Sequence, residues 1–150
     1  MQGTCDMDST AERLTLSIPS HPRYLCVLQG FFGSLLAALG FTSHEGMRVT
    51  LAVHEACANV IAHGYHGDPR QRIDLTVLVT PADLVVEIRD YGSKPDLSAI
   101  APRALQDVRP GGLGTHFMRA IMDSVTYDVS LDRGTLLRMT KRRSVPCTSP

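Results

Sequence analysis

Three polar side chains recur at four-residue intervals in the stretch HEACANVIAHGY (residues 54–65): Glu55, Asn59 and His63. At about 100° per residue in an α-helix, side chains at this spacing form one stripe. That stripe borders an apolar one between Val49 and Val60, so we expect the three side chains at the margin of a buried face. There a carboxylate can act as a general base, and an amide oxygen can bind a hard cation such as magnesium. Taken alone, the trio equally fits the ordinary boundary of an amphipathic helix.

The same stretch contains a His-Glu pair, which is half of the zinc-binding His-Glu-x-x-His motif. The motif needs a second histidine at position 58, where the chain has Ala58. His54 and His63 also lie about 180° apart on a helix, so they do not face one metal ion. The pattern therefore does not indicate a zinc site.

A second candidate site follows the predicted strand at 84–88, where the chain reads Asp90-Tyr91-Gly92. An aspartate at a strand end can accept a hydrogen bond from an exocyclic amine. A glycine two residues later allows the backbone to approach a flat ring closely. As an isolated motif, Asp-x-Gly is also typical of a simple turn.

A third candidate is the sequence Arg109-Pro110-Gly111-Gly112-Leu113-Gly114, which leads directly into a predicted helix. Unpaired backbone amides and the dipole at a helix start together form an anion site. No Gly-Lys-Ser/Thr follows, as a Walker loop requires, and no strand precedes, as a dinucleotide fingerprint requires. The alternative interpretation is a flexible linker that ends in a helix cap.

These candidate residues must be held in place by strands, predicted from period-two alternation, and by helices, predicted from helical spacing. We expect strands at 13–18, 73–79, 84–88, 125–130 and 135–140, and helices at about 22–40, 42–63 and 113–122. Gly40 can end the first helix, and Thr42 with Glu45 has the capping-box spacing that begins the second. This order predicts an α+β two-layer sandwich, with helices packed on one face of a mixed, mainly antiparallel sheet.

The length of 150 residues is typical of one domain. We expect a disordered N-terminus at 1–12, a single domain at 13–142 and a frayed tail at 143–150. Fifteen Lys and Arg balance fifteen Asp and Glu, so no global field favours direct binding to nucleic acid or to a membrane. An uncharged run at 24–43 is long enough to cross a bilayer, but its leucine stripe favours a helix packed on a sheet. The four cysteines lack Cys-x-x-Cys spacing and are expected to be reduced thiols of a cytosolic protein.

Together and in this order, the motifs resemble the anti-sigma-factor serine/threonine kinases of bacterial partner-switching systems, within the histidine-kinase-like ATPase superfamily. LAVHEACANVIAHGY resembles the family's Glu-x-x-x-Asn helix, DYGSKPDL its first glycine box and PGGLGTHFMRAIMD its second. The turn at Gly134-Thr135 resembles the family's final phosphate-side turn. The likeness extends from about residue 13 to residue 142, and it implies the Bergerat fold of that superfamily.

The resemblance also implies a site for ATP and Mg²⁺. On its phosphate side, Glu55 would take the proton from an attacking hydroxyl, Asn59 would hold magnesium, and His63 would lie near a phosphate. The phosphates would be bound at a helix start, by Arg109, Gly112, Leu113 and Gly114. Residues 93–111 would be the ATP lid.

On the adenine side, the resemblance implies that Asp90 reads the adenine amine. Gly92 would let the adenine lie against the backbone, and Thr135 would line the nucleotide site. The chain departs from the wider superfamily at Lys94, which stands where a second glycine is usual.

By the same resemblance, the chain would phosphorylate an anti-anti-sigma antagonist on serine or threonine, sequester a sigma factor and form a homodimer. The first predicted helix offers Arg23 for partner contact but has Cys26 one turn later, which leaves the identity of the partner open. Two alternatives also stay open. The chain would otherwise be an ATP-binding partner-switch module without phosphoryl transfer, or a stand-alone histidine-kinase-type catalytic domain.

Overall fold

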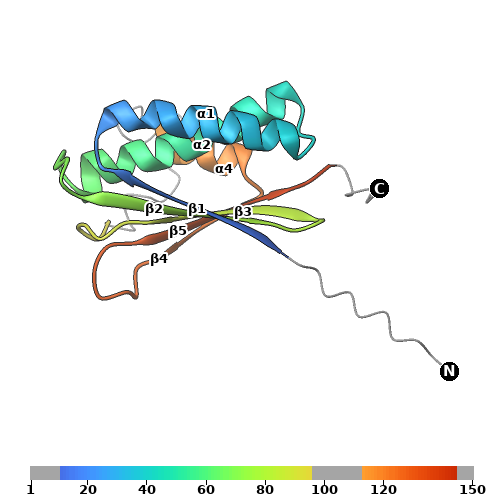
Figure 1. The fold of residues 1–150 in the computed structure, drawn as a ribbon. Helices are drawn as coiled ribbons and strands as arrows, with labels where there is room; N and C mark the ends of the chain where they lie inside the picture. The colour runs from blue at the N-terminus through green and yellow to red at the C-terminus, as the bar shows by residue number, and fades with distance from the viewer. Residues whose placement is uncertain (1–10, 96–112, 145–150) are drawn as a thin grey trace.

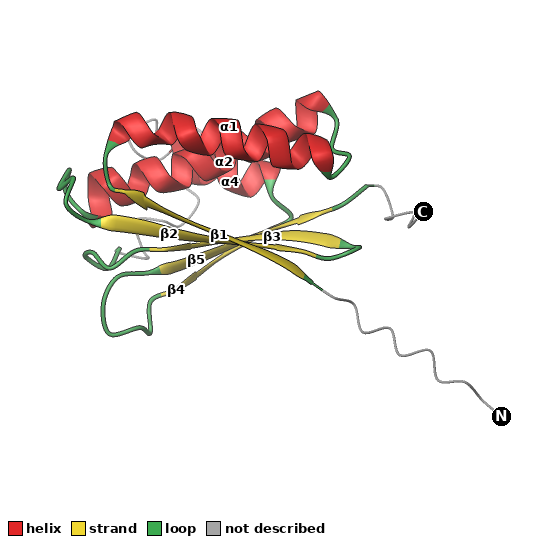
Figure 2. Cartoon of the chain, viewed as in Figure 1, coloured by secondary structure: helices red, strands yellow, loops and turns green. Residues whose placement is uncertain are grey.

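The computed structural model describes residues 11–95 and 113–144. Within them, helices cover one face of a five-stranded sheet, and the other face carries no helix (Figures 1 and 2). The strands are β1 (Glu12–Pro19), β2 (Arg72–Val79), β3 (Asp83–Arg89), β4 (Ser124–Asp128) and β5 (Leu136–Arg142). The α-helices are α1 (Leu25–Ala38), α2 (Ser43–Asn59) and α4 (Leu113–Ile121). The predicted α+β two-layer sandwich is confirmed.

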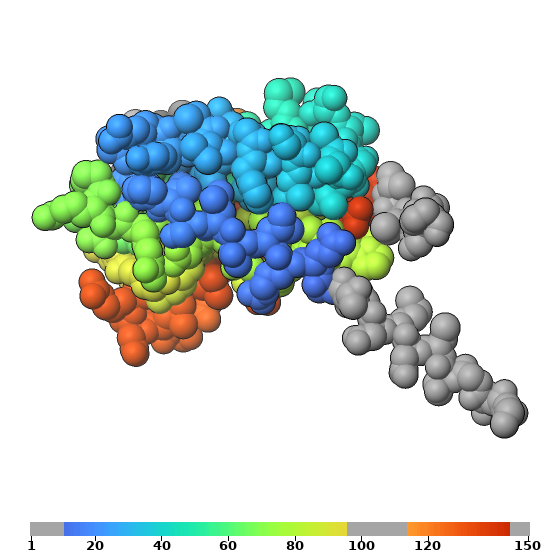
Figure 3. Space-filling model, in the orientation of Figure 1, coloured from blue at the N-terminus to red at the C-terminus, as the bar shows by residue number. Residues whose placement is uncertain are grey.

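The strands lie in the order β1-β2-β3-β5-β4, and every pair in this part of the chain is antiparallel. The expected mainly antiparallel sheet is thus antiparallel throughout the described strands. Its register places Ile18 opposite Ile73 and Val86 opposite Met139, so apolar side chains share the helix-facing side. β1 forms one edge, in dark blue below α1 in the space-filling view (Figure 3).

The core lies between the sheet and the helices because alternate strand residues point at apolar helix stripes. In β2, buried and half-buried residues alternate along most of the strand. From α1 the largest contribution is Phe32, which is fully buried. Truncating such a side chain to alanine costs about 3–5 kcal/mol of stability.

The helix boundaries follow the predicted local signals. Thr42 and Glu45 form a reciprocal capping box at the start of α2, in which the Thr42 side chain accepts from the Glu45 N–H. Gly40, at a φ of 83°, follows the end of α1 in the left-handed region that glycine favours. Pro22 begins the short 3-10 helix η1 (Pro22–Tyr24) that precedes α1. Among the described residues, no helix has the length and apolar content needed to cross a bilayer.

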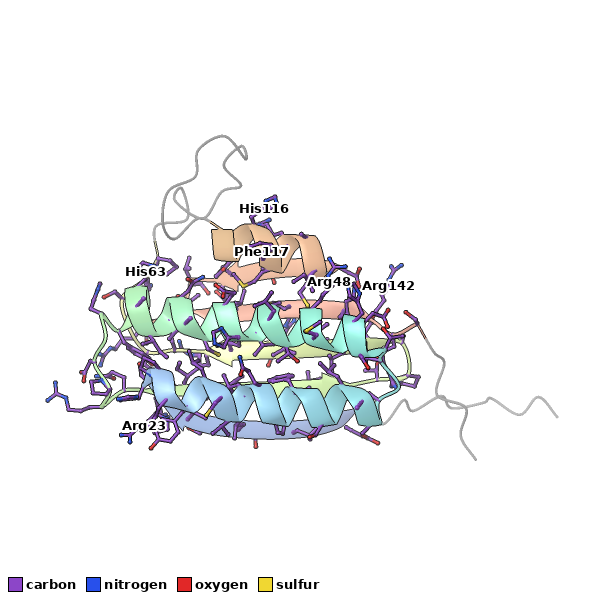
Figure 4. All side chains as sticks on the ribbon, turned by 90° about the horizontal axis from the view of Figure 1, so that it is seen from above. Arg23, Arg48, His63, His116, Phe117 and Arg142 are labelled. Atoms are coloured by element: carbon purple, nitrogen blue, oxygen red, sulfur yellow. The ribbon has the colours of Figure 1, made fainter. Side chains whose placement is uncertain are left out.

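Helix α2 is the middle helix of the layer, between α1 and α4 (Figure 4). It continues as the π-helical turn η2 (Val60–Gly64), so the helical stretch ends where the sequence predicted, near His63. At the C-terminal end of the described chain, Arg143 donates to the carbonyl oxygens of Thr80 at 2.8 Å and of Leu39 at 3.2 Å. These bonds tie a residue of the expected tail to the folded body.

Candidate functional site

Glu55 and Asn59 lie one turn apart on α2, at the edge of its buried face. The apolar stripe beside them is at most 2% exposed: Val49, Ala52, Val53 and Ala56. Both polar side chains are half-buried, with Glu55 33% exposed. The predicted position of the two residues, at the margin of the core, is what the structure shows.

The start of α4 lies directly against these two side chains. Gly114 is buried, and an ideal Cβ placed on it would lie 2.9 Å from Oε2 of Glu55 and 3.5 Å from Nδ2 of Asn59. A side chain at this position would therefore displace the Glu55 carboxylate from its place against the first turn of α4. The first amides of a helix have no intrahelical partner, and its dipole favours negative charge. A carboxylate, a carboxamide and an anion-binding helix end thus converge.

His54, to which the sequence assigned no role, is a close neighbour of Glu55. Its Nδ1 atom lies 3.8 Å from Oε1 of Glu55. This nitrogen is buried and has no hydrogen-bond partner in the described structure. The histidine is therefore a direct neighbour of the Glu55 carboxylate in the folded chain.

His63 lies in the π-helical turn η2, beyond the α-helical part of the predicted stripe. Beyond Asn59 the helix widens into the π turn, in which the Tyr65 N–H donates to the Val60 carbonyl at 2.9 Å. The rotation of an α-helix no longer applies there. His63 is exposed at the end of α2 remote from Arg48 (Figure 4). Its predicted place near a phosphate stays a prediction.

Asp90 forms the second part of the site, at the end of β3. The side chain is only 4% exposed, and Oδ1 accepts the Gly92 N–H at 3.0 Å. Burial raises the pKa of the Asp90 carboxyl above its ordinary value, against the opposing effects of the Gly92 amide and the Arg89 charge. A buried carboxylate of this kind suits a donor that arrives with a ligand.

Gly92 packs against the end of η2, the turn that follows α2. A Cβ on Gly92 would lie 2.6 Å from the carbonyl carbon of Gly64 and 2.9 Å from Cδ1 of Tyr65. The Ser93 N–H donates to the Gly64 carbonyl at 2.9 Å, and the Tyr91 N–H donates to the Tyr65 hydroxyl at 2.8 Å. The glycine is therefore required by chain packing, whether or not an adenine also lies here.

Thr135 lies beside Asp90, as its place in the predicted site requires. The Asp90 N–H donates to the Thr135 carbonyl at 3.0 Å. Thr135 is 4% exposed, and its Oγ1 atom has no hydrogen-bond partner within the described residues. The preceding Gly134, at a φ of 66°, packs on Asp90, because a Cβ there would lie 2.6 Å from the Asp90 carbonyl carbon. The Thr135 hydroxyl is thus a buried polar group that a polar ligand edge can satisfy, in a residue hydrogen-bonded to the backbone of Asp90.

Several predicted positions lie outside the described residues. These are Arg109, Gly112 and, apart from residues 93–95, the lid at 93–111. Leu113 begins α4, where the sequence placed the helix start.

Sequence reasoning missed Gly64, Tyr65 and Arg89. Gly64 connects the two parts of the site, because a Cβ on it would lie 3.6 Å from Oδ1 of Asp90. Tyr65 is 6% exposed, and its hydroxyl donates to the Arg72 carbonyl at 2.5 Å. The available signal was the Gly-Tyr pair directly after the predicted helix, where a glycine ends a helix and a buried tyrosine needs a partner.

The arrangement suits a nucleotide with a metal ion. Asp90 and the orphaned Thr135 hydroxyl fit an amine-bearing ring edge, and the start of α4 fits an anion. The half-buried Asn59 side chain offers an amide oxygen, which can bind a hard cation. The described residues contain no group of three or more His, Cys, Asp or Glu side chains that could hold a metal. A magnesium ion here would therefore depend on the amide and on ligand phosphates.

Comparison with known proteins supports this assignment. The family model for the histidine kinase-like ATPase domain matches residues 18–141. The serine-protein kinase RsbW of Bacillus subtilis (strain 168) is 27% identical over 143 residues, which cover 90% of this chain and 88% of that protein. RsbW of Halalkalibacterium halodurans is 26% identical over 138 residues, which cover 87% of this chain and 83% of that protein. RsbW of Listeria monocytogenes serotype 4b is 27% identical, with 90% of each chain covered. The kinase family recognised from the sequence motifs is confirmed.

Proposed function

The chain belongs to the histidine kinase-like ATPase domain family, and from that premise we propose that it is an ATP-dependent serine/threonine protein kinase. Its substrate is an anti-anti-sigma antagonist protein. When unphosphorylated antagonist is scarce, the kinase sequesters a sigma factor. The observation that carries the proposal is the convergence of Glu55, Asn59 and the start of α4 at Gly114.

In the proposed reaction, Glu55 accepts the proton of the substrate hydroxyl. The hydroxyl oxygen forms a bond to the γ-phosphorus of ATP while the bond from that phosphorus to the bridging oxygen breaks, and ADP leaves. Asn59 would hold Mg²⁺, which neutralises phosphate charge when bound. The first amides of α4 bind phosphate oxygens at a helix end that favours anions.

At the other end of the nucleotide, the Asp90 carboxylate accepts a hydrogen bond from the adenine amine, and the Thr135 hydroxyl forms a hydrogen bond to the adenine edge. Both residues are buried, and the Thr135 hydroxyl has no partner among the described residues. A buried polar group without a partner discriminates strongly between ligands that satisfy it and ligands that do not. Gly64 and Tyr65 hold this end against α2, which carries Glu55 and Asn59.

The partner assignment is supported by the likeness to proteins named serine-protein kinase RsbW. It includes a homodimer as the working form. Sedimentation of the purified chain gives the mass directly, and a mass of one chain at working concentration contradicts the dimer without affecting the proposed chemistry.

The proposal is tested by transfer of radiolabel from γ-labelled ATP to an antagonist-domain protein. The wild-type chain should label a serine or threonine. Glu55→Gln should keep the shape of the side chain and lose the base, so transfer should fall by about 10²–10⁴-fold. Glu12→Gln, an exposed change on β1, is the matched control and should transfer at the wild-type rate.

Equal transfer by Glu55→Gln and wild type contradicts the assignment of the base. Tight ATP binding without any phosphoprotein favours the partner-switch module instead. Label that is acid-labile and found on histidine favours the histidine-kinase-type domain.

A further inference from the structure

Arg89 is the last residue of β3 and lies on the face of the sheet away from the helices, in register between Asp74 and Leu136. Its guanidinium donates to three backbone carbonyls. Nη1 donates to Asp90 and, at 3.3 Å, to Thr135, and Nη2 donates to Arg133 at 2.8 Å. One side chain thus binds both segments of the proposed adenine end.

These three oxygens are brought together by the packing of the Gly134 turn on Asp90. Gly134 has a φ of 66°, and a Cβ on it would lie 2.7 Å from the Cα of Tyr91. Carbonyl oxygens that converge in this way repel one another unless a donor lies between them. The guanidinium supplies several donors in one plane, together with a positive charge.

The orientation of the guanidinium is fixed by Tyr91. The Arg89 Cζ atom lies 4.5 Å from the centre of the Tyr91 ring, and Cζ of Arg72 lies 5.0 Å from the same centre. The ring is held at both ends, because its hydroxyl donates to Asp74 at 2.7 Å and its backbone N–H donates to the Tyr65 hydroxyl. Arg89 is therefore held against the ring while it binds the three carbonyls.

We infer that Arg89 is a positioning residue for adenine recognition, because it fixes the Asp90 carboxylate and the Thr135 hydroxyl at one spacing from behind the sheet. Arg89 touches no ligand itself. This inference rests on the proposed function, since it concerns the same nucleotide site.

Arg72 provides a matched control. It shares the stacking on Tyr91 and bonds the Asp74 side chain at 3.1 Å, but none of its described hydrogen bonds reaches the carbonyls of Asp90, Arg133 or Thr135. Arg72→Gln therefore removes one charge and one group stacked on the same ring, together with the bonds to Asp74 and to the Tyr91 hydroxyl. Arg89→Gln likewise removes one charge and one stacked group, but the bonds it removes are the three to the backbone carbonyls.

The experiment measures the affinities of wild type, Arg89→Gln and Arg72→Gln for MgATP and for MgITP, whose 6-oxo group cannot donate to Asp90. Wild type should prefer MgATP. Arg89→Gln should bind MgATP about tenfold more weakly than wild type does, which is the scale of one charge-assisted hydrogen bond. It should bind MgITP nearly as well as wild type does. Arg72→Gln should keep the wild-type ratio. If Arg89→Gln does not fold, Arg89→Lys replaces it. Lysine keeps the charge but not the planar set of donors, so the ratio should still fall.

Equal losses for MgATP and MgITP in the Arg89 variant overturn the inference, because a purely structural role weakens both. The inference is also overturned if Arg72→Gln changes the ratio of MgATP to MgITP affinity as much as the Arg89 variant does, because the effect would then come from stacking on Tyr91. If wild type binds neither nucleotide, the proposed function itself fails. The two failures are thus distinguishable.

Discussion

Gly114, the second residue of α4, faces Glu55 on α2, and a Cβ at position 114 would lie 2.9 Å from Oε2 of the carboxylate, which would have to shift. The contact places the proposed base beside the end of a helix that starts after the predicted lid. The position of the carboxylate and the position of α4 therefore depend on each other.

We expect Gly114→Ala to impair phosphoryl transfer far more than nucleotide affinity. The added methyl group displaces either Glu55 or the start of α4, and a misplacement of about 1 Å can cost roughly 10²-fold in rate. Single-turnover transfer and MgADP affinity measure the two effects separately. Gly33→Ala, where a Cβ meets no atom within 4 Å, is the control. Wild-type transfer by the Gly114 variant would contradict the close contact.

Gly92→Ala should destabilise the fold. Its Cβ would meet backbone atoms of Gly64, which cannot move aside as a flexible side chain can. We expect the free energy of unfolding to fall by about 1–3 kcal/mol, as in other overpacked sites. Gly30→Ala, in open space on α1, should instead raise it by up to about 1 kcal/mol. Urea unfolding compares the two, and equal midpoints would refute the packing argument.

Asp90→Asn should weaken MgATP binding without loss of stability at neutral pH. Because burial raises the pKa of Asp90, the wild-type fold is favoured below the unfolded pKa of 3.8 and loses that contribution as pH rises through the folded pKa. Asparagine carries no buried charge and should lack this decline. Asp132→Asn, at an exposed turn, is the control. Unchanged MgATP affinity in Asp90→Asn would contradict adenine reading.

Glu45 should contribute a pH-dependent part of the stability of α2. The hydrogen bond from the Thr42 side chain lowers the pKa of Glu45 below 4.5, helped by the Thr42 amide. Stability from this group is therefore present above about pH 4.5 and lost as pH falls through the folded pKa. Glu45→Gln keeps a capping side chain but does not titrate. Urea unfolding should show wild type as the more stable above that pH, with the difference closing in acid; a constant difference would contradict the linkage.

The sequence predicted those parts of the fold that depend on local signals. The capping box at Thr42 and the glycine end at Gly40 satisfy backbone groups within a few residues, and the strand alternation around Val77 follows from one buried face. Asp90 was also identified correctly as a strand-end residue.

The features that the sequence did not predict depend on contacts between distant segments. The π turn changes the rotation after Asn59, and no periodicity of apolar residues encodes that change. The close approach of Gly92 to Gly64 joins positions nearly thirty residues apart, and Arg89, just beyond the predicted strand at 84–88, received no role from the sequence. Its bonds to the Arg133 and Thr135 carbonyls form only when β3 and β5 are paired.

The bonds that Tyr65 and Gly64 make with the segment after Asp90 connect the proposed adenine end, through η2 and α2, to the proposed reacting end at Glu55. Binding energy gained at the adenine is then available to align groups far from it. A phosphate donor without a purine, such as inorganic triphosphate, would lose turnover and not merely affinity. Adenine would thus increase the rate of phosphoryl transfer as well as contribute to substrate recognition.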